Sequence, residues 1–559
     1  MAISPPRPGR ATHAVANQAP PLAPSNLLTT NAPLAEALER EGGSWGAARA
    51  EAAGERWGSE EVLEWAVQAN EHPPVLRTHD RYGHRIDEVD FHPAWHALMR
   101  LSSQSGVHAL PWTDPRPGAH VVRTALSLIG GQVEAGHGCP MTMTFAAVPA
   151  LRAQPEIAAE WEPLLTAASY DGRLVPASQK GSAKCGMSMT EKQGGSDVRA
   201  NTTSAAPLHG SGGAGEEYEL RGHKWFTSAP MCDLFLVLAQ TAEGVGCFAV
   251  PRILPDGTRN PFLLQRLKDK LGNRSNASAE VEFDGTWGRL VGDPGRGVRT
   301  ILEMVGHTRL DCTIGSAAGM RMAVTQAVHH ARHRAAFGRA LVDQPLMRNV
   351  LADLALESEA ATALCVRLAR TYDDASDPAG PTERPQALKR LGTAVAKYHV
   401  CKRFPGVAFE ALECLGGNGY VEESGMPRLY REAPLNSVWE GSGNVNALDV
   451  LRTLAKEPDA FEAFAAELEA AAGADKHFDA FTERLRAGFS DPAALELRAR
   501  RVVEDMAVAW QAALLLRHAP HAVGDAFCAA RLGGDRGLSY GTLPPGTDFE
   551  AIITRALPA

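Results

Sequence analysis

The sequence lacks any apolar run that approaches the roughly 20 residues needed to cross a bilayer. It also lacks the apolar segment of a secretory signal, because its first residues are rich in proline and alanine. The net charge of −9 argues against a surface built throughout for nucleic acid. We therefore expect a cytoplasmic protein that does not enter a membrane.

Paired cysteines and metal-ligand spacings are missing as well. The nine cysteines are scattered and never form a C-x-x-C pair, so we expect buried free thiols rather than disulfides or a zinc site. His307, His329 and His330 have no spacing typical of metal ligands, and no metal site is predicted. No G-x-G-x-x-G follows a strand-like run, which leaves a nicotinamide-binding site without support.

A chain of 559 residues is too long for one hydrophobic core, so several domains are expected. The sequence pattern is mostly helical over residues 33–166, and one helix is expected to begin near Asp90. Short β-rich runs follow, at 217–222, 234–239 and 246–251, with a glycine-rich turn at 210–215. Helical patterns then return, and a Pro/Asp/Gly-rich loop is expected at 373–385. This α+β organisation predicts an arm and four domains, at 1–32, 33–185, 186–296, 297–455 and 456–559.

Two segments carry the clearest chemical signals. Residues 189–197 form a polar, glycine-containing loop whose hydroxyls and amides suit a phosphate or a flavin edge. Residues 436–444 place one carboxylate, Glu440, on a Gly/Ser-rich turn before an apolar helix. Taken alone, the first is also typical of a polar β-turn and the second of a surface glutamate.

Together these segments resemble the flavin-binding and catalytic-base loops of the acyl-CoA dehydrogenase family, and in detail its AidB-like branch. The resemblance covers essentially the whole chain, including residues 12–18 of the arm. It implies the acyl-CoA dehydrogenase fold, with an N-terminal helical domain, a β-domain, a helical bundle and an additional C-terminal helical domain. The implied cofactor is FAD. The implied FAD contacts are Met189, Thr190, Gly195, Ser196, Phe226, Thr227, Ser228, Arg334, Phe337, Gln344, Gly416, Gly417, Trp439, Gly441 and Asn444, with substrate contacts at Thr190, Ser196 and Ser228.

The resemblance makes Glu440 the catalytic base. Dehydrogenation of a thioester requires a base for its weakly acidic α-proton, and burial strengthens a carboxylate base because it disfavours the charged form. Phe226 falls where most family members have a tryptophan, and Ser228 where they have a threonine that bonds flavin N5. Trp225 beside them is equally typical of a core residue.

A second set of motifs is implied to serve the FAD of a neighbouring subunit, and hence a homotetramer. Arg334, Phe337 and Gln344 form Arg-x-x-Phe-Gly followed by Gln, and arginine suits a diphosphate because its planar fork makes paired bonds. Gly416 and Gly417 open a glycine-rich loop. A solvated helix face and a helix C-cap are the structural alternatives for these two motifs.

The implied activity is α,β-dehydrogenation of acyl-CoA thioesters, such as isovaleryl-CoA, with a role in the DNA alkylation-damage response. Lys192, where common family members carry proline, and the fourth domain favour an alternative, a flavin-containing DNA-binding protein with vestigial activity. An acyl-CoA oxidase is the third reading. The branch is associated with double-stranded DNA, yet residues 456–559 carry 11 basic against 16 acidic side chains. Arg498, Arg500, Arg501 and Arg517 are the candidate DNA contacts, or else an ordinary solvated helix face.

Overall fold

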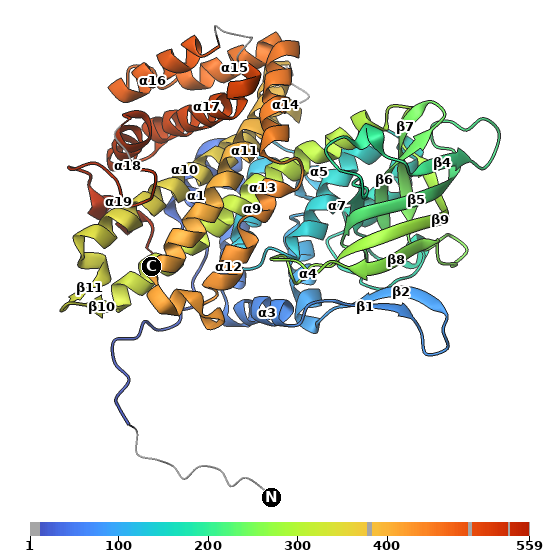
Figure 1. Cartoon of the computed structure of the whole chain (residues 1–559), viewed down its shortest axis with the longest axis horizontal. Coiled ribbons are helices and arrows are strands. Elements are labelled where there is room, and N and C mark those ends of the chain that lie inside the picture. Colours follow the sequence, from blue (N-terminus) through green and yellow to red (C-terminus); the bar gives the residue numbers. More distant parts are fainter. Residues whose placement is uncertain (1–11, 377–382, 490–494, 535–536, 558–559) are drawn as a thin grey trace, which may run out of the picture.

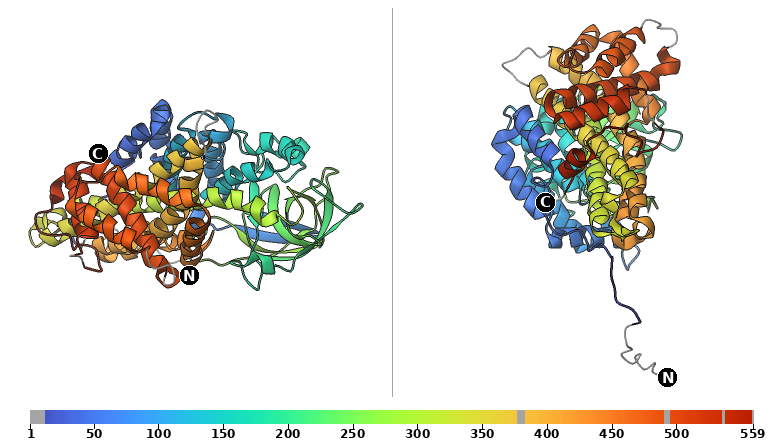
Figure 2. Two further views of the ribbon diagram at one scale, coloured as in Figure 1. Left: turned by 90° about the horizontal axis from the view of Figure 1, so that it is seen from above. Right: turned by 90° about the vertical axis from the view of Figure 1, so that its left-hand side faces the viewer.

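The computed structural model describes residues 12–376, 383–489, 495–534 and 537–557. Figure 1 shows a β-domain beside a larger helical body, and the C-terminal helices stack on the outside of the central bundle (Figure 2). The expected order of helical, β and helical segments is confirmed. The first 11 residues of the expected arm lie outside the described residues.

The N-terminal helical region also contains a β-hairpin that the sequence analysis missed. Its strands pair antiparallel from Val75 opposite Asp90, and Gly83 turns between them with φ of 85°. Exposure alternates along the first strand, as expected for a strand with one covered face, whereas the second strand shows no regular alternation. The helix expected from Asp90 begins instead at Pro93, because His92 caps it. The region comprises α1 (Ala32–Leu38), α2 (Ala47–Trp57), α3 (Glu60–Glu71), β1 (Val75–His79), β2 (Arg85–Asp90), α4 (Pro93–Ser105), α5 (Leu110–Thr113), α6 (Ala119–Gly131), α7 (Gly138–Leu151) and α8 (Pro155–Leu165).

The central domain is a seven-stranded sheet with strand order β3-β6-β4-β5-β9-β7, in which β8 pairs with β9 and β6 also pairs with β7. The three β-rich runs recognised in the sequence fall in β5, β6 and β7, and the predicted glycine turn joins β4 to β5. The register of β5 against β9 shifts between Lys224 and Thr227. Such an irregularity re-aims side chains, and here it lies at Trp225 and Phe226. The strands are β3 (Cys185–Ser188), β4 (Ser204–Pro207), β5 (Glu217–Ser228), β6 (Leu234–Thr241), β7 (Gly244–Pro251), β8 (Phe262–Leu267) and β9 (Ser278–Leu290).

Three long helices form the bundle that follows. The loop expected at 373–385 is shorter than predicted, because Asp373 belongs to α10. The carboxylate of Asp373 accepts hydrogen bonds from the backbone amides of His120 and Val121. Residues 377–382 of that loop lie outside the described residues. The bundle segment comprises α9 (Gly297–His333), β10 (Ala335–Ala336), β11 (Arg339–Ala340), α10 (Pro345–Ser376), α11 (Glu383–Cys414), α12 (Met426–Glu432), α13 (Leu435–Val438) and α14 (Gly443–Lys456).

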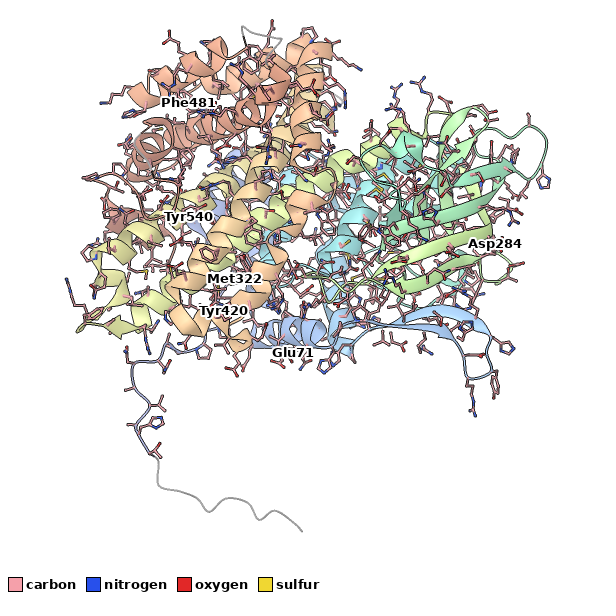
Figure 3. All side chains as sticks on the ribbon, viewed as in Figure 1. Glu71, Asp284, Met322, Tyr420, Phe481 and Tyr540 are labelled. Carbon is pink, nitrogen blue, oxygen red and sulfur yellow. The ribbon has the colours of Figure 1, made fainter. Side chains whose placement is uncertain are left out.

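The C-terminal segment packs on the bundle through buried charge pairs as well as apolar contacts. Arg531 pairs with Asp353 of α10. Arg403 of α11 donates at 2.7 Å to the hydroxyl of Tyr540, a residue labelled in Figure 3. The sequence pattern of this segment predicts helices near 460–472, 493–516 and 521–532. These are confirmed where the structure describes them, and α16 was missed. The helices are α15 (Pro458–Glu469), α16 (Lys476–Ala487), α17 (Leu495–His518), α18 (His521–Phe527) and α19 (Phe549–Arg555).

All nine cysteines are free, and eight are buried, as expected for thiols that pack in a core. Among the described residues, no helix combines the length and the apolar character that a membrane span requires. The same residues contain no cluster of three His, Cys, Asp or Glu side chains arranged to hold a metal ion.

Candidate functional site

A continuous cavity of about 2430 Å³ lies between the N-terminal helices, the β-domain and the bundle. It is larger than the roughly 300–1,000 Å³ typical of a site for one small molecule. Its wall brings together residues that are far apart in the sequence. From the predicted site they are Met189, Thr190, Gly195, Ser196, Phe226, Ser228, Trp439, Glu440 and Gly441.

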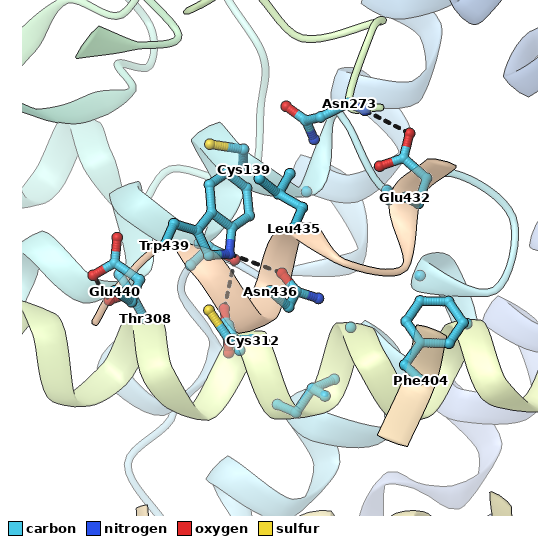
Figure 4. A pocket seen from close by; sticks show the side chains of 18 of the residues that line it. Cys139, Asn273, Thr308, Cys312, Phe404, Glu432, Leu435, Asn436, Trp439 and Glu440 are labelled. Atoms are coloured by element: carbon cyan, nitrogen blue, oxygen red, sulfur yellow. Dashed lines mark hydrogen bonds between the residues drawn. The ribbon is translucent and has the colours of Figure 1, made fainter. Parts of the chain in front are cut away.

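Glu440 lies half-buried on the turn between α13 and α14, with its carboxylate beside α9 (Figure 4). The hydroxyl of Thr308 donates to the carboxylate at 2.7 Å. The guanidinium of Arg309 donates to the backbone carbonyl of Glu440 at 2.9 Å. The side chain of the predicted base is therefore fixed at the cavity wall and is not a mobile surface glutamate.

Burial raises the pKa of Glu440 above that of an ordinary carboxyl group, while the Thr308 hydrogen bond and the charge of Arg309 lower it in part. A carboxylate with a raised pKa takes up a proton more readily than one in water. The site therefore provides a strengthened base facing a large cavity.

Arg309 is itself held in place by a charge network that sequence reasoning missed. Its guanidinium pairs with Asp449 of α14 at 2.6 Å, and Arg390 of α11 pairs with the same carboxylate at 2.6 Å. These residues sit on three helices, and nothing in their local patterns distinguishes them from ordinary charged positions. The network ties the base turn to the bundle.

The 189–197 loop faces the same cavity from the β-domain. Its anchor is Glu191, which is buried and pairs with buried Lys224 of β5 at 2.7 Å. The same carboxylate accepts hydrogen bonds from the amides of Thr202 and Thr203. Lys192 is the unusual residue of this loop in the sequence, whereas the residue that anchors the loop is Glu191 before it.

The loop presents hydroxyl groups to the cavity that have no hydrogen-bond partner among the described residues. The side-chain hydroxyls of Thr190 and Ser196 make no hydrogen bond within the part of the chain that the structure describes. The hydroxyl of Ser228 has one long contact, 3.4 Å to Ser278, and Phe226 is 51% exposed. An aromatic face and three available hydroxyls around a cavity of this size fit a flavin ring and its polar edge.

Thr227 differs from its neighbours in β5. Its side chain is buried and pairs with the hydroxyl of Ser188, so Thr227 can meet a ligand only through its backbone. Trp225 is half-buried rather than a core residue, and the ammonium of Lys268 lies 3.3 Å from the centre of its ring.

The second predicted set of FAD residues does not line this cavity. The guanidinium of Arg334 donates to the carbonyl of Asn17 in the arm, and Gln344 donates to the carbonyl of Ala336 at 3.1 Å. Phe337 is fully exposed on the β10–β11 hairpin. Within one chain these residues therefore do not line the cavity, although Leu415 and Asn418 beside the two glycines do. The members of this set are Arg334, Phe337, Gln344, Gly416 and Gly417. Asn444, predicted as a FAD contact from the base loop, does not line the cavity either.

Comparison with known proteins agrees with the fold. Residues 17–172 match the adaptive response protein AidB N-terminal domain. Residues 186–286 and 295–455 match the middle and C-terminal domains of acyl-CoA dehydrogenases. The chain is 46% identical to AidB of Escherichia coli K12 over 93% of its own length and 94% of that protein.

Other relatives cover less of the chain or are less similar. The Caenorhabditis elegans acyl-CoA dehydrogenase family member 11 is 30% identical over 75% of this chain and 68% of its own. The solved structure of ACDH-11 from that organism, in complex with C11-CoA, superimposes with a TM-score of 0.81 at 26% identity. That superposition covers 99% of this chain and 95% of the other.

Fold and site thus define a flavoprotein of the acyl-CoA dehydrogenase class, whose cofactor is FAD. Within that class, the chain belongs to the AidB branch of the acyl-CoA dehydrogenase family.

Proposed function

We propose that this protein oxidises acyl-CoA thioesters at the α,β-bond, with Glu440 as the base that removes the α-proton. The observation that carries the proposal is the position of Glu440. It is a half-buried carboxylate with a raised pKa, fixed on the wall of a cavity whose other wall presents Thr190, Ser196 and Ser228. A base and a flavin-sized site on one cavity are what this reaction requires.

FAD, when bound, supplies the acceptor for the β-hydride. The residues of this chain would do the rest. Thr190, Ser196 and the neighbouring backbone would hold the ring edge, Ser228 would donate a hydrogen bond to N5, and Phe226 would cover the ring. Glu440 would receive the α-proton on its carboxylate, and the helices around it would keep water from the reacting atoms.

The substrate class is supported by the C. elegans neighbour, whose structure contains C11-CoA. We propose acyl-CoA thioesters for this chain too, with short branched ones such as isovaleryl-CoA as the first candidates. The cavity has room for a dinucleotide and a second ligand together. Assembly as a homotetramer belongs to the same proposal, because Arg334 and Phe337 lie away from this chain's own cavity.

An anaerobic titration tests the proposed activity. The visible spectrum of the FAD-loaded protein is recorded before and after addition of isovaleryl-CoA and of longer acyl-CoA thioesters. Bleaching of the flavin band supports the dehydrogenase, and a band that persists with every thioester contradicts it. Under air, stoichiometric hydrogen peroxide would identify an oxidase instead.

A role in the DNA alkylation-damage response is proposed from the branch alone. The candidate arginines on α17 are partly engaged within the chain: Arg501 pairs with Asp505 at 2.8 Å, and Arg500 donates to the hydroxyl of Tyr398 at 3.3 Å. We therefore expect weak, salt-sensitive binding to duplex DNA. A gel shift that persists at 200 mM salt would show a stronger site than these arginines provide.

A further inference from the structure

Lys397 of α11 is a buried cation whose ammonium contacts the backbone on both sides of the predicted base. Its side chain is almost completely enclosed, with 1% of the residue exposed. The ammonium donates to the carbonyl of Trp439 at 2.8 Å and also to the carbonyl of Gly441. These are the residues immediately before and after Glu440.

The backbone of Glu440 needs such support. The backbone φ of Glu440 is 57°, in the left-handed region that residues other than glycine and asparagine rarely adopt. Gly441 follows with φ of 92°. A carboxylate residue persists in this conformation only when its surroundings fix it.

Three successive carbonyls of the turn are bound by two cations from different helices. Lys397 holds those of Trp439 and Gly441, and Arg309 of α9 holds that of Glu440 between them. Charge-assisted hydrogen bonds of this kind are stronger than neutral ones, and here they replace the hydrogen bonds of a regular helix or strand.

We propose that Lys397 is a positioning residue for the base, which holds the Glu440 peptide in its left-handed conformation so that the carboxylate faces the reacting carbon. This inference rests on the proposed dehydrogenase function. Misplacement of a reacting group by about 1 Å can cost about 100-fold in rate, so a clamp on the peptide acts directly on catalysis.

Lys397 also contributes to the charge around the base. The titratable and charged groups that face Glu440 are Arg309 and Cys312 of α9, Lys397 of α11 and Cys139 of α7. Loss of the Lys397 charge removes one of the influences that lower the pKa of Glu440. A purely structural lysine would change stability without moving the pH dependence of the reaction.

The test compares Lys397→Met and Lys397→Gln with the conservative Lys397→Arg. Lys402→Met is the matched control, because Lys402 lies on the same helix and its ammonium lies over the ring of Tyr398. We expect the limiting rate of anaerobic flavin reduction to fall about 100-fold in the Met and Gln variants, with little change in KM. We expect the pH midpoint of that rate to move upward, and Lys397→Arg to restore the midpoint.

Hydrogen exchange of the peptide that contains Glu440 gives a readout that needs no turnover. It should speed up in Lys397→Met and Lys397→Gln and remain unchanged in Lys402→Met. The positioning role would be overturned if either neutral variant combined three results. These are flavin reduction at the wild-type rate, an unshifted pH midpoint of that rate, and unchanged hydrogen exchange of the Glu440 peptide. Failure of every acyl-CoA to reduce the wild-type flavin would instead refute the proposed function, and the exchange result would still decide whether the clamp exists.

Discussion

Thr308 and Glu440 are joined by a hydrogen bond of 2.7 Å across 132 residues of sequence. The bond connects the N-terminal third of α9 to the turn before α14, and it fixes the carboxylate at the cavity wall. Since α9 also lines the cavity along much of its length, one helix shapes the site and orients its base. The position of the base is therefore a tertiary property of the bundle.

Removal of the Thr308 hydroxyl should shift the pH dependence of the reaction. The rate should rise with pH as Glu440 ionises, with a midpoint above the value near 4.3 of a free glutamate. The Thr308 hydrogen bond lowers the pKa of Glu440. Thr308→Val should therefore move the midpoint of the rate profile to higher pH, as measured by stopped-flow reduction. An unchanged or lower midpoint would show that the hydroxyl does not act on the base.

Ser228 is predicted to donate to the flavin, because its hydroxyl lines the cavity and has only a 3.4 Å contact to Ser278. Ser228→Ala should keep its FAD and slow substrate-driven reduction about tenfold, which corresponds to the loss of one hydrogen bond of about 1.4 kcal/mol. Ser228→Thr keeps the hydroxyl and should reduce at close to the normal rate. Equal reduction rates in the Ala and Thr variants would show that the Ser228 hydroxyl does not donate a hydrogen bond to the flavin.

The buried pair of Lys224 and Glu191 should be necessary for the flavin loop. Lys224→Met leaves a buried carboxylate without its partner, at a cost of about 3–5 kcal/mol. We expect a lower thermal midpoint and loss of FAD on dialysis. The double variant Lys224→Met with Glu191→Leu removes both charges and should recover part of the stability. A single variant as stable as the wild type would contradict this account of the loop.

Arg334 should affect FAD binding although it lies outside the cavity of its own chain. If it serves a neighbouring subunit, Arg334→Ala should lower the ratio of FAD to protein, and light scattering shows whether assembly survives. Arg332→Ala, two residues earlier in the last turn of α9, is the control. Full FAD occupancy in Arg334→Ala would contradict the shared site.

The order of domains and the two loops on the cavity were predictable because they depend on local patterns. Glycine-rich turns, β-rich runs and helical periodicity predicted the β-domain and the bundle, and the motif around Glu440 indicated a turn that lines the cavity. The β1–β2 hairpin and α16 were missed because their patterns are short and resemble the helices and loops around them.

The supporting residues of the site were not predictable in this way. Thr308, Arg309 and Lys397 look like ordinary helix positions, and their importance arises only where two helices, α9 and α11, bring them to one turn. The left-handed conformation of Glu440 is likewise invisible in the sequence, because glutamate carries no preference for it.

The most direct measurement is single-turnover flavin reduction by isovaleryl-CoA, compared anaerobically between the wild type and Glu440→Gln. The variant should fold normally, because the raised pKa of Glu440 means that its ionised form opposes folding at neutral pH. Glu462→Gln on α15 serves as a distant control. The account predicts full FAD binding in all three proteins and no reduction in Glu440→Gln. Reduction of Glu440→Gln at the wild-type rate would contradict the assignment of Glu440 as the base.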